Sequence, residues 1–164
     1  MKPLTLACAA LLAVALAHTC RAEAPTFADL DKSMAAASKQ GKLLFVQYGR
    51  TACGNCQALR GYVSSGKLDL PTNQFVYADV NCDDRKTIQS FGKHFKVEGN
   101  MLPFVVIADS NGRQLAARVG FGQPGDFEEL IKEAMKKGPK APALKKALAA
   151  EKAAGTNAVL KAAQ

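Results

Sequence analysis

The sequence predicts a single α/β domain with a four-stranded mixed sheet, and two observations lead to that prediction. Apolar runs of strand length alternate with segments of helical periodicity, in the order α-β-α-β-α-β-β-α. The last two strands are joined by a short turn with Asn111-Gly112 at its centre, which is a hairpin signal. We therefore expect a parallel, right-handed β-α-β half, an antiparallel hairpin half, strand order 2-1-3-4 and helices on both faces.

The chain begins with the pattern of a secretory signal peptide. A basic residue, Lys2, precedes an almost entirely apolar run over residues 4–17, and a small-residue exit ends at Ala22. A membrane-spanning helix needs about 20 apolar residues, so the run favours cleavage after Ala22 over a membrane anchor. We predict an exported protein, periplasmic or secreted, with a signal peptide at 1–22, a folded domain at 23–137 and a tail at 138–164.

The N-terminal half of the predicted domain alternates between helix and strand. Residues 27–40 carry apolar side chains at helical spacing, and Gly41 ends that pattern. Residues 42–48 contain too many consecutive apolar side chains for a half-exposed strand, which predicts a central strand. We then expect a helix at 53–64, a loop at 66–73 and a second strand at 75–80.

The C-terminal half contains the third helix, the hairpin and the last helix. Asp83 or Asp84 is expected to cap the third helix, whose apolar positions are Ile88, Phe91 and Phe95. The remaining predicted elements are a strand at 104–108, which opens after Gly99-Asn100 and Pro103, a strand at 113–119 and a helix at 126–135.

A Cys-Gly-Asn-Cys motif at residues 53–56 stands at the junction of the central strand and the following helix. In this position the helix N-terminus points unpaired N–H groups at the sulfur of Cys53, which favours thiolate over thiol. Cys56 lies one turn further along, close enough to close a small disulfide ring. Two of the five cysteines fall in the signal peptide, so the mature chain keeps this pair and one more thiol, Cys82.

Three further features follow the Cys53–Cys56 motif: Leu102-Pro103 at a strand start, the Ser110-Asn111-Gly112 hairpin and Val119-Gly120. On the motif and these features, the chain resembles the thioredoxin superfamily over residues 27–135. The resemblance implies a thioredoxin-like fold and thiol–disulfide exchange, in which Cys53 attacks and Cys56 resolves the mixed disulfide. It also implies that Leu102 and Pro103 present backbone to a substrate. A cis peptide bond before this proline is expected, because only an X–Pro bond adopts the cis form at a small free-energy cost. No cofactor is expected.

Three positions depart from the thioredoxin pattern. Ala52 stands where an aromatic residue usually precedes the first cysteine, and Gly54-Asn55 replaces Gly-Pro, which frees one more N–H and loosens the turn. Gln47 replaces the buried acid that accepts the proton of the second cysteine. Because glutamine cannot take a proton, Cys56 must lose its proton to water or to another base. We expect Gln47 to be a polar residue at the edge of the core and not a catalyst.

Other interpretations of the cysteines stay open. One alternative is a non-enzymatic binding module for a peptide or a metal, with a purely structural disulfide. A zinc site made of Cys53, Cys56, Cys82 and His94 is disfavoured, because these spacings fit no standard zinc pattern. Cys82, at a strand end, fits a buried packing residue better than a regulatory thiol, and His94 is expected to be solvated.

Two arginines flank the motif. The guanidinium of Arg50 or Arg60 could stabilise the Cys53 thiolate, although the effect of an exposed arginine is small. We expect Arg60 to be an ordinary surface residue.

The charge distribution limits the kinds of partner that the chain can bind. The chain carries a formal charge of +8, but residues 23–135 contain 13 basic and 13 acidic side chains, and residues 136–164 contain seven lysines and one glutamate. Basicity is therefore a property of the tail, which lacks aromatic residues and does not support a nucleic-acid interface. We expect a monomer that exchanges with protein thiols and disulfides and with a redox partner, such as a membrane reductase. The tail is expected to be flexible and to touch anionic surfaces weakly.

Overall fold

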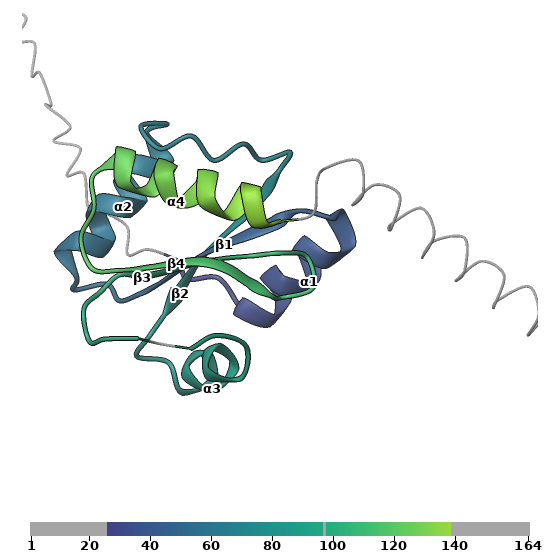
Figure 1. The fold of residues 1–164 in the computed structure, drawn as a ribbon. Helices are drawn as coiled ribbons and strands as arrows, with labels where there is room; N and C mark the ends of the chain where they lie inside the picture. Colours follow the sequence, from purple (N-terminus) through teal and green to yellow (C-terminus); the bar gives the residue numbers. More distant parts are fainter. Residues whose placement is uncertain (1–25, 97, 139–164) are drawn as a thin grey trace, which may run out of the picture.

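A computed structural model describes residues 26–96 and 98–138, which form four helices and four strands (Figure 1). The predicted signal peptide, and the predicted tail beyond Gly138, lie outside the described residues. In chain order the elements are α1 (Leu30–Gln40), β1 (Leu43–Gly49), α2 (Gly54–Ser64), β2 (Phe75–Asn81), α3 (Arg85–His94), β3 (Phe104–Ala108), β4 (Gln114–Val119) and α4 (Pro124–Lys137).

The sheet has the predicted strand order, β2-β1-β3-β4, and it is mixed. β1 pairs in parallel with β2 and antiparallel with β3, and β3 pairs antiparallel with β4. β1 is therefore a central strand, which explains its nearly continuous run of buried residues. In the parallel pair, Gln47 of β1 stands opposite Asp79 of β2.

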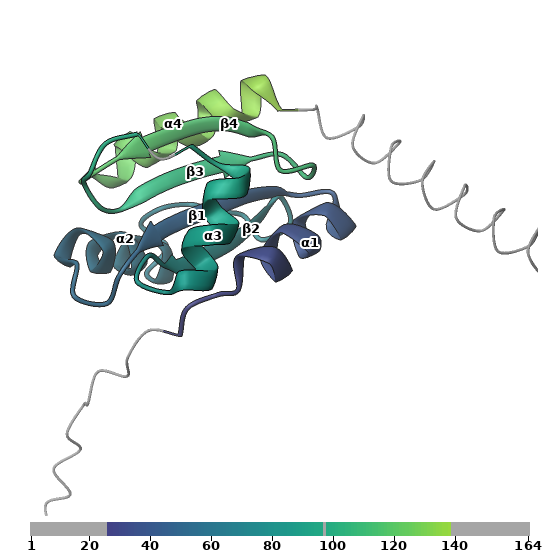
Figure 2. The same ribbon diagram turned by 90° about the horizontal axis from the view of Figure 1, so that it is seen from below.

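Helices cover both faces of the sheet, as predicted. In Figure 1, α2 and α4 lie above the sheet and α3 lies below it, and Figure 2 looks onto the face that carries α1 and α3. Because side chains alternate along a strand, β1 contributes Phe45 to the core beneath α2 and α4, and Leu44 and Val46 to the core beneath α1 and α3.

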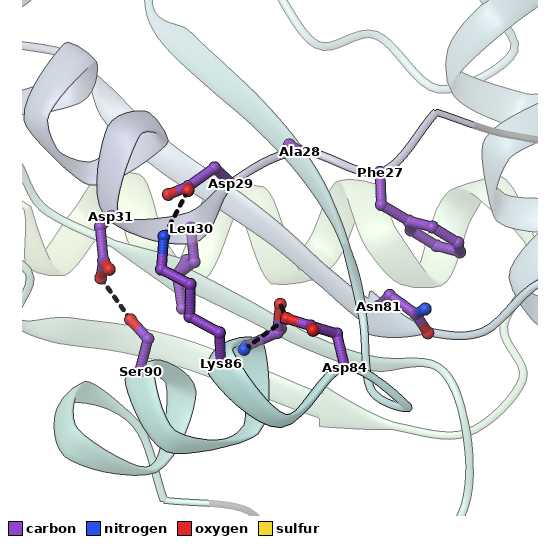
Figure 3. A pocket seen from close by; sticks show the side chains of 10 residues that line it. Phe27, Ala28, Asp29, Leu30, Asp31, Asn81, Asp84, Lys86 and Ser90 are labelled. Carbon is purple, nitrogen blue, oxygen red and sulfur yellow. Dashed lines mark hydrogen bonds and ion pairs between the residues drawn. The ribbon is translucent and has the colours of Figure 1, made fainter.

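Aspartates cap α1 and α3 and also join the two helices. Asp29 caps α1, so this helix begins three residues later than predicted, and Asp84 is the residue that caps α3. Lys86 Nζ donates to Asp29 at 2.7 Å, and the Ser90 hydroxyl donates to Asp31 (Figure 3). These side chains line a hollow of about 290 Å³. The predicted site residues take no part in lining it.

The apolar face predicted for α3 is partly wrong. Phe91 and Phe95 are buried as expected, but the side chain of Ile88 is 47% exposed. The buried face of α3 carries the polar side chains of Thr87 and Ser90 beside Phe91, and Ser90 hydrogen-bonds to Asp31 of α1. Ile88 is thereby turned toward solvent.

The last helix is longer than predicted at both ends. Pro124 occupies its first turn, and the Asp126 carboxylate accepts the backbone N–H of Gln123, the N-cap residue, at 2.7 Å. A proline and a capping pair therefore start the helix before the apolar periodicity does. Across residues 26–96 and 98–138, no helix is long and apolar enough to cross a membrane.

We predict that Phe91→Ala lowers the free energy of unfolding by about 3–5 kcal/mol, because it empties a core position whose ring lies 4.3 Å from that of Tyr48 and 5.9 Å from that of Phe104. The matched control is Ile88→Ala on the same helix, which should change the free energy by less than about 0.5 kcal/mol. Denaturant unfolding of both variants measures the difference. Equal losses would contradict the observed orientation of α3.

Candidate active site

Cys53 caps the N-terminus of α2 and is disulfide-bonded to Cys56. The helix begins at Gly54, one residue after the predicted start, and Asn55 lies beside it in the first turn. Cys53 Sγ accepts the backbone N–H of Cys56 at 3.1 Å. Cys53 is half-buried, whereas Cys56 is fully buried. An incoming molecule can therefore reach the Cys53 sulfur, and the helix N-terminus favours its thiolate.

Gly49, the last residue of β1, leaves the space that the buried sulfur of Cys56 occupies. A Cβ atom at this position would stand 2.7 Å from Cys56 Sγ and 3.2 Å from Cys56 Cβ. A separation of 2.7 Å is shorter than any side chain tolerates, so only glycine lets the sulfur lie against the strand. The backbone carbonyl of Gly49 also accepts the N–H of Cys82 at 2.7 Å, which extends the pairing of β1 and β2 by one bond.

The predicted proline loop lies beside the motif. Because β1 and β3 are antiparallel, the end of β1 and the start of β3 share one edge of the sheet. The Leu102–Pro103 peptide bond is cis, as expected, and Asn55 Nδ2 donates to the Leu102 carbonyl at 3.5 Å. The Pro103 carbonyl accepts the N–H of Gly120 at 2.9 Å. Within the described part of the chain, the Leu102 N–H has no hydrogen-bond acceptor.

Two exposed apolar side chains flank this loop. Met101 is 62% exposed and Phe121 is 49% exposed, although both are large hydrophobic residues. Met101 lies against Gly120, since a Cβ on that glycine would be 3.3 Å from the Met101 Cε. Neither residue has a sequence signal of its own beyond its position next to the Leu102-Pro103 and Val119-Gly120 motifs.

Gln47 lies deeper than predicted. It is fully buried and does not lie at the core edge. Its Nε2 donates to the carbonyl of Cys56 at 2.9 Å, and its Oε1 accepts the hydroxyl of Tyr77 at 2.9 Å. Burial raises the pKa of Tyr77, so the phenol remains a donor. The amide thus connects the backbone of the active-site helix to β2 without introducing a charge.

Arg60 is not the surface residue that the sequence predicts. Its side chain is mostly buried and donates through Nε and Nη2 to the carboxylate of Asp79. Nη2 also reaches the carbonyl of Arg50 at 3.2 Å, and the guanidinium lies over the Phe27 ring, 5.2 Å from its centroid. Burial raises the pKa of Asp79, and the ion pair with Arg60 opposes that shift.

The remaining predicted side chains are Arg50, Cys82 and His94. Arg50 pairs with the exposed carboxylate of Asp83 at 3.1 Å. Cys82 is a buried free thiol and His94 is exposed, both as expected. In the described ranges, no cluster of three or more His, Cys, Asp or Glu side chains is arranged to hold a metal ion.

Three thioredoxins of known structure are similar to this chain, and each alignment covers 62% of it. A mutant thioredoxin from Halobacterium salinarum NRC-1 is 20% identical, with a TM-score of 0.47 and 81% of its own length covered. Mitochondrial thioredoxin 3 from Saccharomyces cerevisiae, in its oxidised form, is 17% identical, with a TM-score of 0.47 and 88% covered. A poplar wild-type thioredoxin h is 16% identical, with a TM-score of 0.48 and 85% covered. No protein-family model matches the chain, and no curated protein does.

The predicted sheet order and the predicted helix layers are confirmed. The four-stranded mixed sheet has the order 2-1-3-4, with a helix pair on each face. At the junction of β1 and α2, the Cys53–Cys56 disulfide provides a dithiol of the kind that thiol–disulfide oxidoreductases use.

We predict that Gly49→Ala destabilises the oxidised protein by about 1–3 kcal/mol, because the new methyl group overlaps the Cys56 sulfur. Gly61→Ala is the matched control. Gly61 lies inside α2 with open space where a Cβ would stand, so alanine should stabilise the protein by about 0.5–1 kcal/mol. Guanidinium unfolding of the oxidised variants tests both. A neutral Gly49→Ala would show that the sulfur does not lie against β1.

Proposed function

We propose that this chain is an exported thiol–disulfide oxidoreductase that exchanges disulfides with protein substrates through Cys53 and Cys56. One observation carries the proposal. The two sulfurs differ in access, because Cys53 is half-buried at a helix N-terminus while Cys56 is fully buried behind it. A dithiol with one accessible and one protected sulfur can attack with the first and resolve with the second.

In the reducing direction, the Cys53 thiolate attacks one sulfur of a substrate disulfide. A bond forms between Cys53 and that sulfur, and the other substrate sulfur leaves as a thiolate. Cys56, after losing its proton, then attacks Cys53 Sγ and releases the second substrate sulfur as a thiolate. Two electrons pass to the substrate and the Cys53–Cys56 disulfide forms. The oxidising direction is the reverse of these steps.

Substrate backbone would dock on the cis-proline loop. The Leu102 N–H has no acceptor in the described residues, so it can donate to an extended substrate segment beside Cys53. Met101 and Phe121 add exposed apolar surface at the same place, where an apolar substrate side chain can be buried. These features support an unfolded or extended protein segment as the substrate.

The signal-peptide pattern at 1–22 supports export to the periplasm or beyond the cell. In such a compartment the dithiol needs a redox partner that restores its working state, such as a membrane reductase or an oxidant. The two cysteines carry the electrons themselves, so the exchange needs no cofactor. We propose that the domain is a monomer. The neutral charge of residues 23–135 gives no support for nucleic-acid binding, and the basic tail supports only weak contact with anionic surfaces.

We predict that Cys53→Ser abolishes reduction of a protein disulfide such as that of insulin, and that Cys56→Ser instead accumulates mixed disulfides with substrate. Attack survives in the second variant and resolution does not. Non-reducing electrophoresis after mixing with an oxidised substrate separates the two outcomes. Cys82→Ser is the control and should retain activity, because Cys82 is buried outside the disulfide.

Trapping by Cys53→Ser and not by Cys56→Ser would reverse the roles of Cys53 and Cys56, and loss of trapping in both variants would contradict the assignment. Slow alkylation of Cys53 after mild reduction would favour the alternative, a thioredoxin-fold binding module with a structural disulfide.

We predict that the chain, expressed in a bacterium, is found outside the cytoplasm with Glu23 as its first residue. The reason is the expected cleavage after Ala22 at the end of the signal peptide. Mass spectrometry of the periplasmic and secreted fractions measures the mature N-terminus. An uncleaved chain in the membrane fraction would contradict export by this route.

A further inference from the structure

Arg60 and Asp79 form a charged pair behind the disulfide. The neighbouring position on β1 is Gln47, which carries no charge. Gln47 faces α2 from β1, and Asp79 stands opposite it on β2. Arg60, one turn after Cys56 on α2, donates to Asp79. The carboxylate is thus displaced by one strand from position 47, and it is paired with a cation of the active-site helix itself.

These groups lie between the sheet and α2 because of strand alternation and helical periodicity. Positions 47 and 79 share the face that also carries Phe45 and Tyr77, which belong to the core beneath α2 and α4. Residues four apart on a helix lie on one face, so Arg60 and Cys56 project from the same side of α2. Cys56 therefore shares a low-dielectric layer with one cation and one carboxylate.

We propose that the Arg60–Asp79 pair sets the proton affinity of Cys56, and thereby the pH at which Cys56 resolves the mixed disulfide. The proposal rests on the proposed function. Arg60 and Asp79 are positioning residues, since they act on Cys56 through the electric field and not by touching substrate. The Arg60 cation favours the thiolate of Cys56, the Asp79 carboxylate disfavours it, and together they hold the net charge behind the disulfide near zero.

The pair acts by charge and not as a base. Arg60 donates two N–H groups to Asp79, which stabilises the ionised carboxylate and opposes its protonation. The Cys56 proton therefore does not pass to Asp79. In the resolving step the thiolate of Cys56 bonds to Cys53 Sγ, and the bond between Cys53 and the substrate sulfur breaks.

The other titratable groups near Cys56 do not duplicate this role. Tyr77 of β2 donates to Gln47, and its raised pKa keeps it neutral. Cys53 of α2 is the reaction partner itself. Arg50 and Asp83, at the ends of β1 and β2, form an exposed ion pair that solvent and salt screen. Arg60 and Asp79 are the charged groups of this buried layer within the described residues.

The test is a pH titration of the Cys56 thiol in the reduced full chain carrying Cys53→Ser, followed by the ¹³Cβ resonance of Cys56. Asp79→Asn leaves the Arg60 cation uncompensated and should lower the pKa of Cys56 by about one pH unit. Arg60→Gln should shift it upward by a smaller amount, because Asp79 without its partner takes up a proton more readily. Arg60→Lys keeps the cation and should remain close to the parent.

Opposite shifts distinguish an electrostatic role from a structural one, because both Asp79→Asn and Arg60→Gln break the same pair and both should lower thermal stability. An unchanged or raised pKa of Cys56 in Asp79→Asn would overturn the proposal. If Arg60→Gln does not fold, Asp79→Asn and Arg60→Lys still decide the question. The titration uses no substrate, so a chain that shows the predicted shift but no exchange activity would refute only the proposed function.

Discussion

The burial of the Cys56 sulfur between α2 and β1 is the constraint on which the rest of the site depends. The sulfur lies where any side chain at Gly49 would stand, so the start of α2 is held directly against the end of β1. Gln47 holds the Cys56 carbonyl from below, and the disulfide leaves Cys53 as the half-exposed sulfur at the helix N-terminus. The difference in access between the two cysteines is therefore a packing result, which the motif alone does not specify.

Most of the fold could be predicted because its signals are local. Strand-length apolar runs, helical spacing and the Asn-Gly turn each lie within a few residues, and together they allowed only a small number of strand orders. The misplaced boundaries have a different origin. Asp29 caps α1, so this helix begins after the first apolar residue of its helical pattern. Pro124 begins α4 before the first apolar residue of that helix. In both cases the capping residues, and not the apolar periodicity, set the boundary. Ile88 was misassigned because the buried face of α3 carries Thr87 and Ser90 beside Phe91, and apolar periodicity does not place polar side chains on such a face.

The sequence located the sulfurs and the proline loop but missed the polar groups behind them. Cys53 and Pro103 are identifiable because each combines a special residue with an element boundary. Asp79 gave no comparable signal, because a single acid in an apolar run is equally consistent with an exposed position and with a buried one. Only the register of β1 and β2 turns it toward Arg60. An alternation test over residues 75–81 would have placed Tyr77 and Asp79 on one face, although not which face meets α2.

The buried ion pair is better explained by function than by stability. The pKa of Asp79 is raised, so the folded chain holds a proton on this carboxylate at pH values where the unfolded chain has released it. Stability from Asp79 is therefore greatest at low pH and declines as pH rises through the folded pKa. At neutral pH the ionised pair carries a desolvation cost, and apolar residues of similar volume often serve stability as well or better. A charged pair in this layer also influences the ionisation of the Cys56 thiol, in a way that no apolar pair could.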